Sequence, residues 1–370
     1  MVERADLTTF TSGAARSVDV AAIERELVRV WKSAAETGEE SAGGVTRACL
    51  LNLIVRAPGT AAEVAAAETV AVVSSELPCR ALVLVEAGEA GGPPLEAWIS
   101  AHCSPAGPGR RQVCCEQVTL RAAHGAVESL PSTVLALLVP DLPVALWWPG
   151  DPDFEGPLFG RLSRCVDRLC VDSAGFADAP RRLASLGAWR RAAGGREVCD
   201  LAWERLAPWR ELVAGFFDAP PFQGMLPALD GVEIEAASAG GEAAGAAPAA
   251  LFAGWMASRL RWTSGARGFE SAGRPLHLAL RMRAHDSGGL LRVVLRAARA
   301  RTRFVVERDA RQPSTLVARV ESAGACPLPL RLAVRPLDGD RQLARVLARA
   351  HRNPAFESAL EAGAAVFAAP

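Results

Sequence analysis

The sequence contains no tyrosine and a single lysine, Lys32, among its 370 residues. Basic and acidic residues number 41 each, so the chain carries no formal net charge at pH 7. Binding to nucleic acid or to an anionic membrane surface through overall charge needs a basic excess, so this balance argues against both partners. Because alanine and glycine are abundant, we interpret the preference for arginine as codon bias in a GC-rich genome rather than a phosphate-binding specialisation.

The sequence motifs of common enzymes are also missing. No G-x-G-x-x-G follows a predicted strand, and Lys32 does not lie in the glycine-rich context of a P-loop. The chain has neither H-E-x-x-H nor G-x-S-x-G. Its five histidines are far apart in sequence, which favours surface or structural roles for them. These absences identify no catalytic motif and no metal site.

Long apolar runs are absent as well. Met1–Asp19 is polar and lacks the apolar segment of a secretory signal. The longest apolar run, Val134–Trp148, is interrupted by Pro140, Asp141 and Pro143 and is too short to span a bilayer. These features predict a cytoplasmic protein. Nine cysteines at irregular spacing in such a chain predict reduced thiols.

A chain of this length exceeds one ordinary core, so two domains are expected. In the first part, buried strands alternate with helices, as in Val45–Val55, Thr60–Leu77 and Cys79–Glu86, which indicates parallel strands joined by crossover helices. In the last part, four strands follow one another through short turns, which predicts an antiparallel meander. These strands are Leu276–Ala284, Leu290–Ala297, Thr302–Asp309 and Thr315–Glu321.

The expected fold class is an α/β N-terminal domain plus an α+β C-terminal domain. The first has a mixed, largely parallel sheet with flanking helices, and the second contains the antiparallel meander. The expected division is a loose N-terminus over residues 1–18, an α/β domain over residues 19–230 and an α+β domain over residues 231–370. Cys199–Trp203 is expected to add one more strand before the helix that starts at Pro208.

The stretch from Asp141 to Asp218 contains five of the nine tryptophans. Trp147 and Trp148 are adjacent at a predicted strand end, so their side chains should point to opposite faces and at least one should reach the surface. An aromatic side chain in that position is a typical binding anchor. Trp209 lies on the apolar face of a predicted helix, which favours a core position. Asp151 and Asp153 follow as a solvated turn or, alternatively, as carboxylates for acid/base work or cation binding.

The cysteines allow two interpretations. Cys114 and Cys115 are neighbours in a predicted strand and should point to opposite faces. Cys165 and Cys170 are separated by four residues, and neither spacing is the C-x-x-C of metal or redox motifs. The favoured interpretation is that they are buried small apolar side chains. The alternative is that these four residues include a regulatory thiol pair.

Four segments carry a family resemblance. Together they resemble the OpcA family, the glucose-6-phosphate dehydrogenase assembly proteins, and the similarity runs from about Cys49 to the C-terminus. The segments are DLPVALWWPGDP (Asp141–Pro152), DRLCVDS (Asp167–Ser173), DLAWERLAPWRELVAGFFD (Asp200–Asp218) and LFAGWMASRLRW (Leu251–Trp262). The chain departs from the family pattern at Ala207, where a capping threonine is common, and the lost cap is worth about 1 kcal/mol.

The resemblance implies a non-catalytic, cofactor-free partner that binds glucose-6-phosphate dehydrogenase and favours its active oligomer. Because tryptophan and arginine dominate binding hot spots, we expect the contact around Trp147, Trp148, Asp151, Trp203, Arg205 and Arg210. A different hypothesis is an enzyme or sensor that binds a sugar phosphate or nucleotide at the carboxyl ends of the first domain's strands. Thiol oxidation could add a layer of control to the first hypothesis.

Overall fold

The computed structural model describes most of the chain as two compact units. The described residues are 8–17, 19–39, 45–88, 93–105, 112–194, 196–238, 245–265, 268–271, 273–285, 288–322, 328–334, 338–349 and 352–366. The first unit comprises Met1–Val171, Gly195–Cys199 and Asp338–Ala350. The second unit comprises Asp172–Gly194, Asp200–Leu337 and His351–Pro370.

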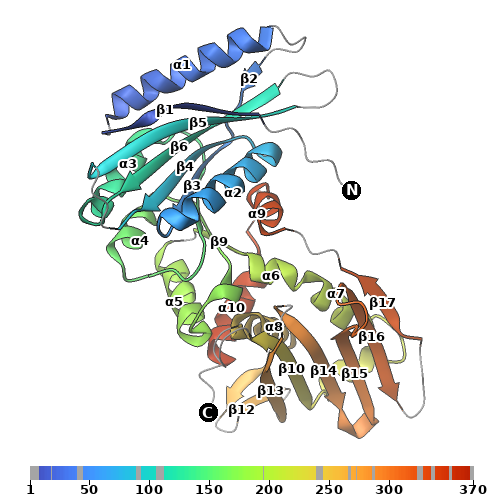
Figure 1. Cartoon of the computed structure of the whole chain (residues 1–370). Helices are drawn as coiled ribbons and strands as arrows, with labels where there is room; N and C mark the ends of the chain where they lie inside the picture. Colours follow the sequence, from blue (N-terminus) through green and yellow to red (C-terminus); the bar gives the residue numbers. More distant parts are fainter. Residues whose placement is uncertain are drawn as a thin grey trace. The chain divides into compact units, whose positions relative to one another are not determined.

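The first unit is built on a mixed, largely parallel sheet (Figure 1). Its strand order is β1 (Thr8–Ser17), β5 (Leu95–Pro105), β6 (Gln112–Ala122), β4 (Cys79–Glu86), β3 (Leu51–Ala57), β7 (Val144–Trp148), β8 (Arg168–Val171) and β9 (Glu197–Asp200), with β2 (Val45–Arg47) pairing β6. The pairs β6–β4, β4–β3, β3–β7 and β7–β8 are parallel, whereas β1–β5 and β5–β6 are antiparallel. The expected α/β fold class is confirmed for this unit.

Helices cover both faces of the central strands of this sheet. They are α1 (Val20–Glu39), α2 (Glu63–Glu76), α3 (Leu130–Leu137), α4 (Pro157–Leu162) and α9 (Gly339–Leu347). On β4, Cys79 lies 3.5 Å from Ser74 Oγ of α2. The next residue, Arg80, pairs with Glu24 of α1 and donates to the Leu137 carbonyl of α3. Because neighbouring strand residues point to opposite faces, α2 covers one face while α1 and α3 cover the other. This double cover explains why β3 and β4 are nearly continuous apolar runs.

Two local expectations for the first unit are wrong. The terminus expected to be loose forms β1 over Thr8–Ser17, because the outer edge of β5 offers it an antiparallel partner. The single strand expected over Val45–Val55 is divided, since β2 pairs with β6 while β3 pairs with β4 and β7.

The second unit contains a mostly antiparallel sheet (Figure 1). Its order is β11 (Thr263–Gly265), β12 (Gly268–Ser271), β13 (Arg274–Ala284), β10 (Gly231–Ser238), β14 (Leu290–Ala297), β15 (Thr302–Arg308), β16 (Thr315–Ser322) and β17 (Leu330–Ala333). The expected meander is confirmed from β14 to β17. However, β13 and β14 are not neighbours, because β10 inserts between them, parallel to β13 and antiparallel to β14.

Helices of the second unit pack on one face of this sheet and on one another. They are α5 (Ala179–Ala192), α6 (Leu201–Arg205), α7 (Ala207–Phe216), α8 (Ala246–Leu260) and α10 (Pro354–Val366). Helix α7 packs on β15 and β16, helix α8 packs on β10 and β13, and α10 packs on α8 and α5. Short 3₁₀ helices are η1 (Thr60–Ala62), η2 (His124–Ser129), η3 (Ser173–Gly175), η4 (Gln223–Ala228) and η5 (Ala298–Ala300).

The division between the units differs from the boundary expected after residue 230. Residues 200–230 belong to the second unit, because aromatic side chains from this segment complete the core of the second unit. Phe216, Phe217 and Phe222 surround Phe304 of β15, with ring centroids 5.3, 4.9 and 5.5 Å away. The expected strand at Cys199–Trp203 is also wrong beyond Asp200, where α6 begins.

Within the ranges described, no helix is both long and apolar enough to cross a membrane.

Candidate functional site

Both tryptophans at the end of β7 are buried. Trp147 is 9% exposed and lies between Val55 of β3 and Cys170 of β8, while Trp148 is 3% exposed. The expectation that one of them reaches the surface is therefore wrong. The strand is central in the sheet, so helices and loops cover both of its faces, and opposite orientation of the two rings does not expose either one.

Trp148 joins a charged pair at the carboxyl ends of three parallel strands. The Arg56 guanidinium of β3 lies 4.6 Å from the Trp148 ring centroid, and Arg56 Nε donates to Glu86 Oε1 of β4 at 2.6 Å. Phe159 of α4 packs edge-on against the same ring at 5.3 Å. Sequence reasoning missed Arg56 and Glu86, although Glu86 ends a predicted strand and Arg56 directly follows another. The cluster lies beside the β3–β7 pair, where strand order reverses and α/β folds commonly hold ligands.

Asp151 follows this strand after a turn that requires glycine. Gly150 has φ 81°, in the left-handed region that side-chain-bearing residues rarely adopt. Asp151 is half-buried, and Asp153 is exposed. Asp151 thus follows the buried tryptophan pair by three residues along the chain.

In the second unit, Trp203 and Arg210 form a stacked pair. Trp203 of α6 is 2% exposed, and the Arg210 guanidinium of α7 lies 3.6 Å from its ring centroid. Arg210 Nη1 also donates to the Trp203 carbonyl oxygen at 2.8 Å. Phe356 of α10 packs against the ring at 5.7 Å. Burial lowers the pKa of Arg210 to about 10, so the side chain is still a cation at neutral pH.

Asp200 organises the start of α6. Its Oδ1 accepts from the backbone N–H groups of Ser173 and Ala202 at 3.0 and 2.9 Å, and its Oδ2 accepts from Ser173 Oγ at 2.5 Å. Burial, reinforced by the nearby charge of Asp172, raises the pKa of Asp200 to about 6. Sequence reasoning did not assign Asp200 a role, because it placed this residue in an expected strand, whereas the structure makes it the N-cap of α6. The hydrogen bonds join two of the segments that carry the family resemblance, Asp167–Ser173 and Asp200–Asp218.

Arg205 is the most accessible of the expected contact residues. Its side chain is 41% exposed and pairs with Asp172, the residue that caps the start of η3. The six expected residues thus divide between the units. Trp147, Trp148 and Asp151 belong to the first unit, and Trp203, Arg205 and Arg210 belong to the second. Within each unit the three residues lie in one local structure.

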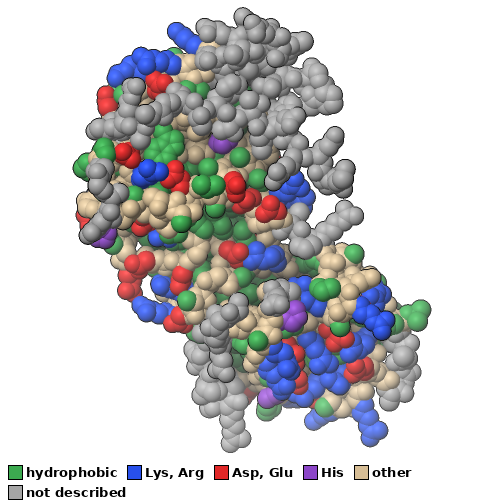
Figure 2. Space-filling model, in the orientation of Figure 1, with side chains coloured by type: hydrophobic (Ala, Val, Ile, Leu, Met, Phe, Trp, Pro, Cys, Tyr) green, Lys and Arg blue, Asp and Glu red, His purple; other side chains and the backbone are tan. Residues whose placement is uncertain are grey.

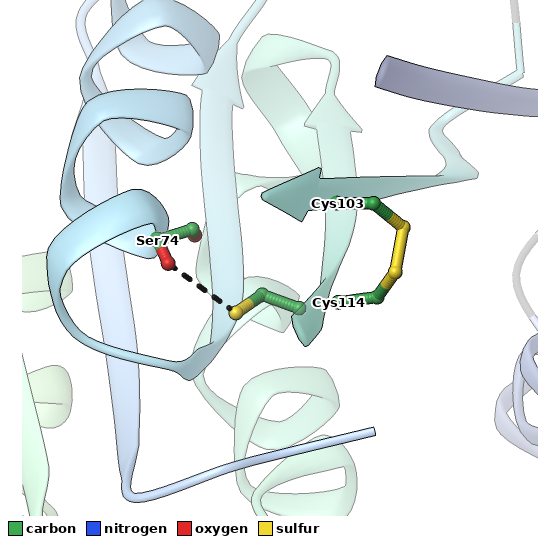
Figure 3. The surroundings of a disulfide bond; sticks show 4 residues. Ser74, Cys103 and Cys114 are labelled. Carbon is green, nitrogen blue, oxygen red and sulfur yellow. Dashed lines mark hydrogen bonds between the residues drawn. A yellow bond between two sulfur atoms is a disulfide. The ribbon is translucent and has the colours of Figure 1, made fainter. Parts of the chain in front are cut away.

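A disulfide links Cys103 to Cys114 (Figure 3). The two residues face each other across the antiparallel β5–β6 pair, and both are buried. The expectation of reduced thiols is wrong for these two. Sequence reasoning named Cys114 and missed Cys103. Sequence alone did not single out this pair, because the register of β5 on β6 decides which of their residues lie opposite each other.

The other three cysteines of the expected redox set do not pair with one another. Cys115 points away from the disulfide, and its Sγ lies 3.6 Å from the carbonyl oxygen of Ser74, which lies on α2 in Figure 3. Cys165 donates to the Leu162 carbonyl at 3.0 Å. A hydrogen bond with Cys170, together with burial, raises the pKa of Cys199 well above its usual value. Burial likewise raises the pKa of Cys115 and of Cys165, which disfavours their reactive thiolate forms.

A metal site does not emerge from the described part of the chain. Among those residues, no group of three His, Cys, Asp or Glu side chains is placed as metal ligands would be. The local structures at Trp148 and Trp203 each combine an aromatic ring with an arginine side chain.

The chain therefore consists of two units, one built on a largely parallel sheet and the other on a mostly antiparallel sheet. Residues 70–188 match the N-terminal domain of the family described as "Glucose-6-phosphate dehydrogenase subunit". Residues 196–360 match the C-terminal domain of the same family. The two matches together span more than half of the chain, which therefore belongs to the OpcA family.

Similar proteins carry the same family name. The "Putative OxPP cycle protein OpcA" of Synechocystis sp. (strain ATCC 27184 / PCC 6803 / Kazusa) is 33% identical over 192 residues, which are 52% of this chain and 39% of that protein. The protein of the same name from Nostoc punctiforme (strain ATCC 29133 / PCC 73102) is 37% identical over 191 residues, 50% of this chain and 38% of that protein. The match thus spans less than half of each relative's length.

Among solved structures, an oxidoreductase from Sinorhizobium meliloti aligns with 87% of this chain and 89% of its own, at 12% sequence identity. The TM-score of 0.41 is too low to support an argument about function.

Proposed function

We propose that this protein is a non-catalytic cytoplasmic partner of glucose-6-phosphate dehydrogenase that favours the active oligomer of that enzyme. The observation that carries the proposal is the pair of matches over residues 70–188 and 196–360, because the description of both domains names the dehydrogenase. The names of the two relatives place them in the OxPP cycle, which supports a role in the same cycle.

The physical basis of such activation is differential affinity. A partner that binds the active oligomer more tightly than other states of the enzyme shifts the population toward that oligomer. A tenfold difference in affinity corresponds to about 1.4 kcal/mol, so a modest interface is sufficient to change activity measurably.

We assign the contact to the expected residues in two roles. Arg205 has an exposed side chain and Asp151 is half-buried, so both reach the surface at least in part. The remaining four are buried or half-buried and support the local structure: Trp147 and Trp148 end the strand that precedes Asp151, and Arg210 holds Trp203 in the helix that carries Arg205. In this assignment no tryptophan contacts the partner directly, because a direct anchor would need an accessible ring.

The experiment is to measure dehydrogenase activity and molar mass by light scattering, with the enzyme from the same organism, in the presence and absence of this protein. We expect higher activity together with a larger complex. Arg205→Ala should weaken binding about fivefold or more, whereas Arg299→Ala, an exposed arginine of η5, is the matched control and should bind normally. Neither complex nor activation, under reducing and oxidising conditions alike, would contradict the proposal.

A further inference from the structure

Helices α7 and α8 pack on one face of the second unit's sheet, and the opposite face is charged. Phe304 of β15 contacts Phe216 of α7, so Arg303 and Val305 on either side of it point away from the helices. Residues that lie opposite each other on neighbouring strands share a face, so the registers from β13 to β17 extend this face across the sheet. We call it the open face.

Ion pairs connect the strands on the open face. Arg283 Nε of β13 lies 2.9 Å from Glu235 of β10, and Arg296 Nη1 of β14 lies 3.1 Å from Glu233 of β10. A Cβ added to Gly231 would lie 2.6 Å from Arg296 Nε, so the absence of a side chain there lets this guanidinium lie over β10. Figure 2 shows Lys and Arg side chains interspersed with carboxylates over this sheet.

The arginines form the outer part of this charged layer. The Arg283 side chain is 57% exposed against 13% for Glu235, and Arg331 of β17 is 54% exposed against 13% for its partner Asp309. Around Arg319 of β16 the order is reversed by a small margin. The arginine is again the more exposed member in the pairs Arg296–Glu233 and Arg303–Glu321. Over most of its area the open face therefore presents guanidinium groups outward and carboxylates inward.

The centre of the open face is apolar beneath the charges. Val294 and Val305 lie opposite each other on β14 and β15, and they are nearly fully buried although they point away from α7 and α8. The long arginine side chains beside them therefore cover them with their aliphatic stems. Arginines held along a sheet in this way lose less conformational entropy on binding than arginines that extend into solvent.

We propose that the open face binds an acidic surface of a protein partner, and that this partner is the dehydrogenase. A guanidinium group has five N–H donors, and a neighbouring carboxylate occupies only part of them. An ion-paired arginine therefore still offers donors to a partner's carboxylate, and no existing pair has to break. Arginine is also enriched in protein interfaces. The inference rests on the proposed function, and it adds a second contact surface to the one that contains Arg205.

The charge arrangement favours an acidic protein over two other occupants. A second copy of the chain would bring one outward layer of guanidinium groups against another, and like charges repel. Nucleic acid would bring a continuous array of phosphates, which would also meet carboxylates such as Glu307 and Glu321. A protein surface can place carboxylates over the arginines and a basic group over these two glutamates.

The test measures the dissociation constant of the complex between the full chain and the dehydrogenase at several salt concentrations, by biolayer interferometry. We expect the affinity to fall as the salt concentration rises. The first variants replace Arg281 of β13, which is exposed and lies opposite Glu235. Arg281→Glu should weaken binding about tenfold or more, Arg281→Ala should weaken it less, and Arg281→Lys should stay within about twofold of the wild type. A structural defect would not follow this order of charge.

Two further variants complete the set. Arg303→Ala, on a different strand, should weaken binding about threefold or more. Arg341→Glu is the matched control, because Arg341 is an exposed arginine of α9 in the first unit, and this variant should bind normally. If thermal unfolding shows that Arg281→Glu does not fold, Arg281→Ala and Arg303→Ala decide the result.

Wild-type affinity in the Arg281 and Arg303 variants would overturn the inference and leave the proposed function standing. An equal loss in Arg341→Glu would also overturn it, because the effect would then be one of overall charge. A dimer of the free chain that Arg281→Glu dissociates, detected by light scattering, would assign the open face to a second copy instead. A wild-type chain that forms no complex with the dehydrogenase at any salt concentration would overturn both this inference and the proposed function.

Discussion

The guanidinium of Arg210 lies 3.6 Å from the centre of the Trp203 ring and donates a hydrogen bond to the carbonyl oxygen of that residue. One arginine therefore holds both the side chain and the backbone of the tryptophan at the junction of α6 and α7. The ring in turn packs on Phe356 of α10, which connects the junction to the C-terminal helix. Packing within the second unit therefore accounts for Trp203 and Arg210, two of the six residues expected to contact the partner.

Replacing Arg210 should destabilise the fold. Arg210→Ala removes the cation–π contact and the hydrogen bond to the Trp203 carbonyl, and we expect a loss of about 2 kcal/mol in the free energy of unfolding. Arg205→Ala is the matched control, because its exposed ion pair with Asp172 should contribute less than about 1 kcal/mol. Urea unfolding measures both. Equal losses in the two variants would contradict the assigned role of Arg210.

The buried position of Trp148 makes a similar prediction for the first unit. Trp148→Ala should cost about 3–5 kcal/mol because it leaves a cavity beside Phe159 and Arg56. Trp148→Phe preserves part of the ring contact and should cost less. Leu135→Ala, at an exposed position of α3, should change stability by no more than about 0.5 kcal/mol. A fully stable Trp148→Ala variant with impaired partner binding would instead identify the ring as a direct anchor.

Asp200 should make stability depend on pH. Its pKa is raised to about 6 in the folded state, from an ordinary value of 3.8, so between these two values unfolding releases a proton. Its contribution is therefore fully present below about pH 4 and is lost as the pH rises through about 6. The total change is on the order of 3 kcal/mol.

Asp200→Asn removes this titration, so its stability relative to the wild type should increase from about pH 4 to about pH 6. Thermal or urea unfolding at several pH values measures the difference. Asp178→Asn is the control. Asp178 is the exposed N-cap of α5, so this variant measures how much the same replacement lowers the free energy of unfolding at another helix cap. A constant difference between wild type and Asp200→Asn across this range would argue against the raised pKa.

The disulfide between Cys103 and Cys114 should stabilise the β5–β6 hairpin. It closes a loop between residues 11 positions apart, so reduction should lower the free energy of unfolding by about 2–3 kcal/mol. The control is the double variant Cys103→Ala, Cys114→Ala, whose stability should not respond to reductant. A thiol assay on the unfolded chain should find two fewer free thiols before reduction than after it. The same samples also test thiol control of binding. If the disulfide regulates the interaction, reduction should change the affinity for the dehydrogenase, which is measured through its activation.

Two glycines in helices should respond oppositely to replacement by alanine. A Cβ at Gly254 of α8 would collide with the Ala359 carbonyl oxygen and the Gly363 backbone of α10, so Gly254→Ala should cost about 1–3 kcal/mol or more. Gly215 of α7 has no atom within 4 Å of such a Cβ, and Gly215→Ala should stabilise the protein by up to about 1 kcal/mol. Chemical unfolding compares them, and destabilisation of equal size would contradict close packing of α8 on α10.

Local patterns were sufficient to predict most elements of this chain. Cys79–Glu86 was predicted as a strand and is β4, and the apolar face that begins at Trp209 lies on α7. These predictions succeed because the periods of strands and helices are properties of neighbouring residues. The two fold classes followed from the order of the elements, and the family resemblance followed from four short segments.

The tertiary structure decided what depends on distant parts of the chain. Sequence could not reveal that β10 inserts between β13 and β14, since strand pairing joins segments far apart along the chain. It could not show that both Trp147 and Trp148 are buried, because exposure depends on which elements cover a strand. Nor could it place Gly231 beneath Arg296, because that proximity comes from the register of β10 and β14. Local residue patterns were thus enough for most elements and for the family, whereas pairing, register and packing between distant segments decided burial and the disulfide.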